Sequence, residues 1–478
     1  MAIPNWLHLS QNSGNGNTTI TVTADTYSEL TARTASIVVK SNSDTAVTKS
    51  VYVQQLGWSG DYSEKYLTFK VTSGGTIAWH TCLTGATQGT EAWIYYSKDN
   101  GTTWHLLNGV TTSSQVSVSS GDTVIFKGNN TYYATGSSSS DYSWFGGSAK
   151  FEVEGNIMSL IYGDNFIGQT TLSSLYTFCC LFKGCTGLTS AENLILPATT
   201  LTAYCYRKMF QGCGNLTTAP TLPATTMESY CYSDMFDNCS RLTTAPFLPA
   251  TTLASNCYGG MFGYCYSLAT APTLPATTLA IRCYYGMFYN CTSLTTAPEL
   301  PATTLSNYCY CGMFEGCSGL TSAPALPATT LAPYCYYGMF LRCSGLTSAP
   351  VLPATTLANS CYYNMFNGCT SLTTAPELPA TTLQEHCYQW MFNGCTGLTS
   401  APVLPATTLQ GQCYWGMFSG CLNLNYIKCL ATDISAVYCT DNWVNGVAET
   451  GTFVKNASMT GWSTSYNGIP YGWTVQDA

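Results

Sequence analysis

The sequence is poor in charged residues. Asp, Glu, Lys and Arg make up 8% of its 478 residues, whereas they make up about 25% of an average soluble domain. Acidic residues outnumber basic ones by 24 to 16, and the net charge is −8. This argues against nucleic-acid binding, which depends on clustered lysines and arginines. We expect neither a metal nor a cofactor, because the four histidines lie far apart: His8, His80, His105 and His386.

Long apolar runs are also missing. No run approaches the ~20 residues of a membrane-spanning helix, so no membrane span is expected. The first residues, Met-Ala-Ile-Pro-Asn-Trp, lack the basic segment and apolar core of a secretory signal. Hydrophobic residues still make up 45% of the chain, which allows a large core over roughly three domains.

An internal repeat dominates the rest of the sequence. Leu-Pro-Ala-Thr-Thr occurs nine times at a constant spacing of 26 residues, from Leu196 to Leu404. One unit reads Leu-Pro-Ala-Thr-Thr-Leu-x3-Cys-Tyr-x2-Met-Phe-x2-Cys-x2-Leu-Thr-x-Ala-Pro-x. A degenerate unit with Phe182, Cys185 and Leu188 precedes the regular ones, as expected for a capping repeat.

Each unit has two halves. The first predicts a short amphipathic helix, because its apolar residues are spaced i, i+3, i+4 and i+7: Tyr206, Met209, Phe210 and Cys213. The segment from Leu216 to Leu222 predicts a short or irregular strand, since its proline lacks an N–H. One unit cannot bury its own apolar face, so we expect the units to stack.

The motif Met-Phe-x-Gly-Cys-x-x-Leu-Thr, as in Met209 to Thr217, resembles the BspA-like leucine-rich repeats. Those repeats occur in surface proteins of Bacteroides-type gut bacteria and in phage proteins. The resemblance covers about residues 182–424 and implies a leucine-rich-repeat solenoid, a short helix plus a strand in each unit, over residues 159–424.

Residues 1–57 alternate apolar and polar positions as strands do, for example at Ile37 and Val39 and again at Val51 and Val53. This region resembles a BACON domain, which implies an immunoglobulin-like β-sandwich. The landmarks of the resemblance are Trp6, Gly14, Gly16, Arg33 and Gln54-Gln55.

Residues 58–158 are predicted to be a second β-rich domain. They contain an Asp box, a hairpin motif found in sialidases and other β proteins: Ser97, Asp99, Gly101 and Trp104. A sialidase would need an arginine triad for the substrate carboxylate, but this region contains no arginine. We therefore interpret the box as structural. The tryptophan-rich residues 425–478 predict a small C-terminal cap, which completes a multidomain protein of all-β sandwich domains, solenoid and cap.

The 25 cysteines are an odd number, so at least one is unpaired. Most form two ladders, from Cys205 to Cys413 and from Cys213 to Cys421, with a period of 26 residues. Eight helical residues span ~12 Å, too far for a disulfide within one unit. The ladders favour reduced, buried thiols. Disulfides between units and a metal or catalytic role are the alternatives, the latter without a supporting Cys-x2-Cys pair.

Two neighbouring positions of the repeat, beginning at Arg207 and Lys208, vary strongly from unit to unit. Variation within a rigid repeat indicates the surface. Aromatic rings there either stack on sugars or a partner protein or lean on neighbouring units. The candidate binding residues are Tyr285, Tyr337, Tyr363, Trp390 and Trp415.

Glycoside hydrolysis needs two carboxylates about 5–10 Å apart. Glu299 and Glu377 share one position of the repeat but lie three units apart, ~15 Å at ~5 Å per stacked strand. Glu152 and Glu154 lie on a predicted strand with the right spacing for a catalytic pair, but a solvent-exposed strand face explains them better. We therefore expect no enzymatic activity.

These resemblances favour a non-enzymatic phage virion protein, a tail or head fibre, whose repeats bind a host-surface glycan or protein. The absence of a visible signal and the many cysteines fit assembly in the reducing host cytoplasm. Its location would then be the virion, with other virion proteins as partners. A bacterial cell-surface or secreted adhesin is the alternative, and a glycan-active enzyme is a remote one.

Overall fold

The computed structural model describes residues 7–9, 22–24, 33–40, 48–55, 62–81, 92–108, 114–138 and 141–478. The chain divides into two units, Met1–Tyr62 and Ser63–Ala478. Within the described residues, helix is limited to α1 (Ser159–Tyr162) and two single 3-10 turns, η1 (Tyr62–Glu64) and η2 (Gly163–Asn165). None of these helices is long and apolar enough to cross a membrane.

The first unit contains two antiparallel strand pairs. They are β1 (Leu7–Leu9) with β2 (Val22–Ala24), and β3 (Arg33–Lys40) with β4 (Thr48–Gln55). In the second pair Ile37 lies opposite Val51 and Arg33 opposite Gln55, so the alternating segments are strands, as predicted. Three landmarks of the BACON resemblance, Trp6, Gly14 and Gly16, lie outside the described residues.

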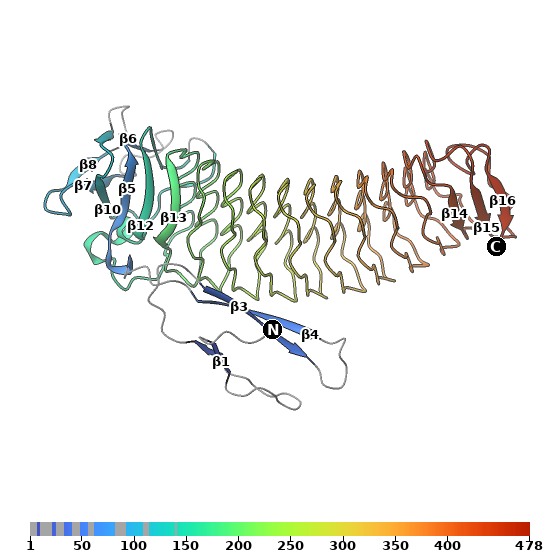
Figure 1. The fold of residues 1–478 in the computed structure, drawn as a ribbon, viewed down its shortest axis with the longest axis horizontal. Coiled ribbons are helices and arrows are strands. Elements are labelled where there is room, and N and C mark those ends of the chain that lie inside the picture. Colours follow the sequence, from blue (N-terminus) through green and yellow to red (C-terminus); the bar gives the residue numbers. More distant parts are fainter. Residues whose placement is uncertain are drawn as a thin grey trace. The chain divides into compact units, whose positions relative to one another are not determined.

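The second unit begins with two sheets (Figure 1). The larger has the order β13-β12-β5-β10-β7-β8 and the smaller the order β11-β6-β9. Rings from both sheets share a core, because the Phe145 centroid of β11 lies 4.8 Å from Phe69 of β5 and 5.1 Å from Phe126 of β10. The strands are β5 (Leu67–Ser73), β6 (Gly75–His80), β7 (Ile94–Ser97), β8 (His105–Leu107), β9 (Gln115–Val118), β10 (Thr123–Gly128), β11 (Trp144–Gly147), β12 (Lys150–Asn156) and β13 (Leu188–Ile195).

The strand-rich region covers the first coil of the repeats. Strand β12 pairs in parallel with β13, which belongs to the degenerate unit. The Phe145 N–H donates to the Leu181 carbonyl at 2.8 Å, and the Phe145 and Phe182 rings stack at 5.4 Å. One continuous hydrophobic core then runs from Leu67 to Trp473. The predicted division at residue 158 therefore falls within a single core.

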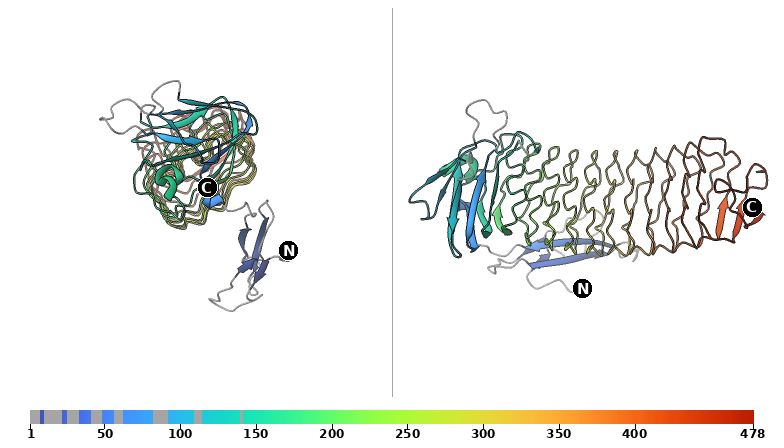
Figure 2. Two further views of the ribbon diagram at one scale, coloured as in Figure 1. Left: turned by 90° about the vertical axis from the view of Figure 1, so that its left-hand side faces the viewer. Right: turned by 90° about the horizontal axis from the view of Figure 1, so that it is seen from above.

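Each 26-residue unit forms one coil, and successive coils lie side by side (Figures 1 and 2). Residues 204–213 are not helical but form a run of overlapping four-residue turns. The N–H groups of Arg207 and Met209 donate to carbonyls three residues earlier. The N–H groups in between donate to carbonyls of the next coil. The Tyr206 N–H donates to the Cys231 carbonyl at 3.0 Å, and the Phe210 N–H donates to the Met235 carbonyl at 2.9 Å. The predicted helix is therefore wrong.

Positive backbone φ angles explain why these turns cannot be a helix. In this coil φ is 62° at Tyr204, 56° at Lys208 and 76° at Gly212, whereas a helix needs φ near −63°. A type II turn requires φ > 0 at its third residue, and glycine adopts it most easily. The position of Lys208 accordingly holds glycine in five other units: Gly260, Gly286, Gly312, Gly338 and Gly416.

The spacing of the apolar residues suggested a helix because burial in the coil repeats every four residues: two side chains point inward and the next two point outward. Five side chains of one coil are fully buried: Cys205, Tyr206, Met209, Phe210 and Cys213. Over nine residues, a period of four and the helical period of 3.6 select nearly the same positions.

Replacing Gly338 by alanine distinguishes turn from helix by the sign of its effect on stability. In a helix, alanine would stabilise by about 1 kcal/mol relative to glycine. Gly338 has a φ of 57°, where an L side chain costs about 1–2 kcal/mol. An added Cβ would meet no atom closer than 3.7 Å, so no clash contributes. We expect a lower free energy of unfolding in urea.

Gly214 provides the matched control for this substitution. It is not among the residues with positive φ, and an added Cβ would lie 3.6 Å from its nearest neighbour, Ser240 Oγ. Gly214→Ala should be neutral or slightly stabilising. A stabilising Gly338→Ala would contradict the turn structure.

The inward side chains form ladders along the stack. Tyr206 to Tyr414 stack from coil to coil at 5.7–6.1 Å between centroids. Phe182 to Phe418 stack at 5.4–5.8 Å. Five tyrosine hydroxyls lack a hydrogen-bond partner among the described residues, so these tyrosines pack mainly through their rings: Tyr206, Tyr232, Tyr258, Tyr284 and Tyr336.

The predicted burial of both cysteine ladders is confirmed. All 24 described cysteines are buried and free; Cys82 lies outside the described residues. In the second ladder, the thiol of Cys239 donates to the Phe210 carbonyl of the preceding coil at 3.1 Å. The same contact recurs from Cys213 to Cys421 at 3.0–3.2 Å. Burial raises the pKa of Cys205 to about 12 and that of Cys213 well above its usual value, so the thiols stay neutral.

The extended halves of the regular coils are joined by isolated parallel bridges, such as Thr244 to Thr270 and Thr270 to Thr296. Full strands occur in the two flanking units, at β13 and β14 (Tyr426–Cys429). Both of these units lack the Ala-Pro step, and proline removes a donor from the ladder. The isolated bridges confirm the predicted irregular strand, and the missing proline N–H explains why the regular units form no longer ladder.

The C-terminal segment continues the coils before it closes the core. Strands β14, β15 (Thr452–Lys455) and β16 (Thr474–Asp477) pair in parallel. Trp443 takes the place of the repeat methionine, and its carbonyl accepts from the Phe418 N–H at 2.8 Å. Its ring stacks on Trp462 at 5.5 Å. The predicted cap, 425–478, thus includes one further coil.

Candidate ligand-binding face

The outward side chains of each coil form rows across the stack. We call the row that contains Tyr204 and repeats every 26 residues the first row, and the row that contains Arg207 the second row. Four predicted candidates lie in the second row, and Trp390 lies in the position directly after it. Turn geometry, rather than the predicted helix, directs these side chains outward.

Aromatic rings form a continuous line at the C-terminal end of this face. Tyr337 and Tyr363 stack at 4.7 Å, Tyr363 meets Trp390 edge-on at 5.7 Å, and Trp390 lies 5.7 Å from Trp415. Tyr438 continues the line at 6.2 Å from Trp415. We call these five residues the aromatic stripe. The four predicted members are half-buried, so each ring leans on its neighbours and keeps part of its surface exposed.

Glycine makes room for the central tryptophan of the stripe. A Cβ on Gly416 would lie 2.0 Å from Cδ1 of Trp390, which is far closer than two carbon atoms can approach. The Trp390 ring therefore rests directly on the backbone of the next coil. This fixes its orientation and lowers the entropy that it would lose on binding.

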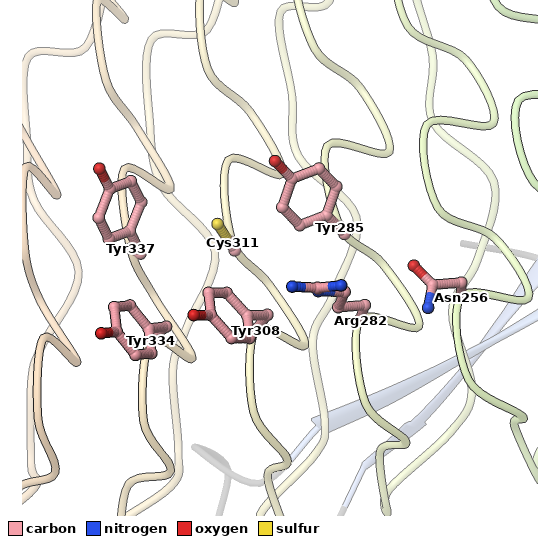
Figure 3. Close-up of a pocket in the computed structure, with 7 residues that line it drawn as sticks. All are labelled: Asn256, Arg282, Tyr285, Tyr308, Cys311, Tyr334 and Tyr337. Carbon is pink, nitrogen blue, oxygen red and sulfur yellow. The ribbon is translucent and has the colours of Figure 1, made fainter.

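A groove of about 590 Å³ opens between the two rows near the middle of the stack (Figure 3). We call it the tyrosine groove. Its volume is within the range of small-molecule sites, ~300–1,000 Å³. Its walls come from four successive coils and consist of Asn256, Arg282, Tyr285, Tyr308, Cys311, Tyr334 and Tyr337.

The rings of the tyrosine groove are held by stacking. Tyr308 and Tyr334 lie 4.5 Å apart with nearly parallel planes, and the Tyr334 and Tyr337 centroids are 6.1 Å apart. The Arg282 guanidinium lies 4.7 Å from the centroid of Tyr308, a distance typical of a cation–π contact. Tyr285 is 45% exposed, so its ring remains available to a ligand.

The charges near the groove are few. Arg282 is exposed, and within the described part of the chain it has neither an ion pair nor a side-chain hydrogen bond. Arg207 differs, since its guanidinium donates to Ser137 Oγ at 3.0 Å and lies 3.9 Å from Asp234. Burial raises the pKa of the nearby Glu315, and the positive charge of Arg342 partly offsets this rise.

The sequence prediction found the second row but missed the first. Tyr285 and Tyr337 do line the groove, with Cys311 of the intervening coil between them. Arg282, Tyr308 and Tyr334 were not predicted. The signal was present, because the residue before each Cys-Tyr pair varies as strongly as those after it. The first row reads Tyr204, Tyr230, Asn256, Arg282, Tyr308, Tyr334, Ser360, His386 and Gln412.

The Asp box forms the hairpin between β7 and β8, which are antiparallel as predicted. The Asp99 carboxylate accepts from the Ser97 hydroxyl at 2.7 Å and from the Thr103 N–H and hydroxyl at 2.9 and 2.6 Å. These bonds lower the pKa of Asp99 to about 2. Gly101, with a φ of 87°, donates its N–H to Ser97 Oγ.

Trp104 of the Asp box packs below the turn. Its ring meets Tyr66 at 5.3 Å between centroids, and the ammonium group of Lys127 lies 4.1 Å from its centroid. The polar groups of the box are therefore used within the hairpin, which agrees with a structural role.

The predicted solvated face on β12 is wrong for one of its two carboxylates. Glu152 is exposed, but Glu154 is buried. Its carboxylate lies 2.7 Å from the ammonium group of Lys70 and 3.7 Å from that of Lys65. Two flanking lysines thus compensate the buried charge. Glu299 and Glu377, in contrast, are both exposed.

Comparisons with known proteins agree with this architecture. The chain matches the family model of the BspA-type leucine-rich repeat region over residues 165–295, 258–389 and 313–437. Residues 3–56 match the BACON family, described as an N-terminal binding domain. No curated protein matches the chain at a significant level. The two families suggest a surface-binding or adhesin-like protein. Since the repeat matches together span residues 165–437, more than half of the sequence, the chain belongs to the BspA-type leucine-rich repeat family.

Proposed function

We propose that this protein is a non-enzymatic adhesin whose coils form a solenoid that binds an extended glycan on a cell surface. The observation that carries the proposal is the aromatic stripe, in which adjoining rings from successive coils are partly exposed along one face. The apolar faces of sugar rings stack on aromatic side chains, and a row of rings suits a chain molecule better than a single small ligand.

The pre-organisation of the stripe supports binding. Each ring rests on its neighbour, and the Trp390 ring rests on the backbone of Gly416. Few rotamers therefore remain to be lost when a ligand binds, and immobilising a flexible side chain costs ~0.5–1.5 kcal/mol. In this proposal the BACON region and the strand-rich region that follows it are β-sandwiches that attach or space the solenoid.

We place the protein in a phage virion, as a tail or head fibre that is assembled in the host cytoplasm with other virion proteins. The support is chemical, since the 24 cysteines in the described part of the chain are buried free thiols, which suit folding in a reducing compartment. A bacterial cell-surface or secreted adhesin is the alternative. Neighbouring genes for portal, tail or capsid proteins would favour the phage, and neighbouring genes for export or surface anchoring would contradict it.

Removing two rings of the stripe tests the proposed binding. A ring stacked on a ligand contributes ~1–3 kcal/mol, by analogy with nucleic-acid bases, so Trp390→Ala combined with Trp415→Ala should weaken binding at least tenfold. The measurement is the affinity of the purified chain for a panel of bacterial capsular and cell-wall polysaccharides.

A second pair of exposed rings serves as the control. Tyr264 and Tyr266, which are 37% and 44% exposed, lie outside both the stripe and the groove. Alanine at both positions should leave the affinity unchanged. If the tryptophan double variant folded and also kept its affinity for polysaccharide, the two rings would serve packing alone, and the proposed binding face would be wrong.

A further inference from the structure

Arg282 is the one arginine of the first row and follows Asn256 there. In the first row it precedes Tyr308 and Tyr334, and all three residues have φ between 54° and 59°, so their side chains leave equivalent backbone positions. Figure 3 shows Arg282 between Tyr308 and Asn256, with Tyr285 beside it. The guanidinium is thus part of the groove wall. It belongs to a protein with five arginines and a net charge of −8.

The cation–π contact with Tyr308 orients Arg282 without neutralising it. A guanidinium that stacks on a ring uses its face and leaves the N–H groups at its edge free. No carboxylate among the described residues forms an ion pair with Arg282, whereas Arg207 has Asp234 nearby. The groove therefore presents a positively charged, planar set of donors beside four exposed or half-exposed tyrosine rings.

We propose that the tyrosine groove binds a carboxylated sugar of an acidic polysaccharide, with Arg282 holding the carboxylate. This inference rests on the proposed glycan-binding function and names the class of glycan. A carboxylate accepts two parallel N–H bonds from one guanidinium, and the sugar ring would stack on Tyr308, Tyr334 or Tyr285. Because the protein is acidic overall, non-specific attraction of a polyanion is unfavourable, and the positive charge of Arg282 must act locally.

The groove and the aromatic stripe share Tyr337, which lines the groove and stacks on Tyr363. A polysaccharide that is anchored by its carboxylate at Arg282 therefore reaches the stripe without leaving the rows of aromatic rings. The groove would supply charge selectivity, and the stripe would supply most of the contact area.

The experiment compares acidic polysaccharides with their carboxyl-reduced forms, in which each carboxylate becomes a neutral hydroxymethyl group. The probes are polygalacturonate, alginate and hyaluronan, together with dextran sulfate and a panel of neutral polysaccharides. We expect at least one carboxylated polymer to bind at least tenfold more tightly than its reduced form. Arg282→Gln should abolish that preference, so that the carboxylated polymer and its reduced form bind with similar affinity. Arg282→Lys keeps the positive charge but loses the two parallel N–H donors of the guanidinium, so it should retain only part of the preference for the carboxylated polymer.

Arg241→Gln is the matched control, since Arg241 is exposed and lies outside the groove. It changes the net charge equally and should leave the preference intact. Three outcomes overturn the inference while the proposed function stands: neutral polymers bind but acidic ones do not, Arg282→Gln binds as the wild type does, or only dextran sulfate depends on Arg282. If no polysaccharide of any class binds, the proposed function itself fails.

Discussion

Phe314→Ala in the middle of the stack is expected to destabilise the second unit by about 3–5 kcal/mol, the usual cost of removing a fully buried phenylalanine. Phe314 is completely buried, and its ring stacks on Phe288 at 5.6 Å and on Phe340 at 5.7 Å. The coils cannot easily close the resulting cavity. Backbone bonds from Phe288 to Met313 and from Phe314 to Met339, both 2.9 Å, hold the coils at their spacing.

Urea unfolding measures this loss, and Phe247→Ala is its control. Phe247 is 47% exposed, so truncating it should change the free energy of unfolding by less than about 0.5 kcal/mol. A cost below about 1 kcal/mol for Phe314→Ala would mean that the phenylalanine ladder is not a packed core.

The repeat length and the core residues were predictable from the sequence because the same residue types recur every 26 residues. Leucine, alanine, cysteine, tyrosine, methionine and phenylalanine recur at fixed positions of the unit, and these columns form the buried ladders of the described coils. Packing against the same position of the next coil restricts each column to one residue type. The extended half was predictable as well, since proline at a fixed position excludes a regular strand.

The local conformation of the first half was not predicted, because its hydrogen bonds are not local. Every second N–H in residues 204–213 is paired with a carbonyl of the next coil, and a pattern within one unit contains no sign of that partner. An alignment of the units does reveal the turn conformation. Glycine and asparagine recur at the positions of Lys208 and Gly212, four residues apart, which indicates positive φ and excludes a helix.

The candidate site was predicted in part for a related reason. Variation between units identified Tyr285 and Tyr337, but only a coil of turns brings the residue before the Cys-Tyr pair to the same face. The structure was therefore needed to place Tyr308, Tyr334 and Arg282 on the same face as Tyr285 and Tyr337. Arginine occurs once in this row, which also holds Asn256, Ser360, His386 and Gln412. The periodic pattern therefore gives no reason to single out Arg282.

Deleting residues 222–247, one complete unit, is expected to leave a folded protein, whereas deleting residues 222–234, half a unit, should prevent the stack from folding. After the full deletion Thr221 is followed by Leu248, just as Leu222 follows it now. Tyr206 and Phe210 then meet Tyr258 and Phe262, so both ladders continue. The stack loses one coil and one coil-to-coil interface. Because the stability of a repeat protein is roughly the sum of such terms, the free energy of unfolding should fall only by the contributions of that coil and that interface.

The half deletion removes the Leu-Pro-Ala-Thr-Thr and Cys-Tyr segments of one coil but keeps Met235 and Phe236. The N–H groups of Tyr206 and Lys208 then lose their acceptors at Cys231 and Ser233, and each buried group without a partner costs about 1–3 kcal/mol. The tyrosine and cysteine ladders are interrupted as well. These losses together approach the ~5–15 kcal/mol that stabilise a typical domain.

Circular dichroism and thermal unfolding compare the two deletions with the intact chain. The full deletion should melt cooperatively, with a melting temperature a few degrees lower, and should keep the affinity for polysaccharide, since it spares the tyrosine groove and the aromatic stripe. The half deletion should show no cooperative transition for the stack. Two equally folded variants would mean that register between coils does not matter, and two unfolded variants would mean that the units are not interchangeable. Either result would contradict a stack in which each coil is held by the matching position of the next.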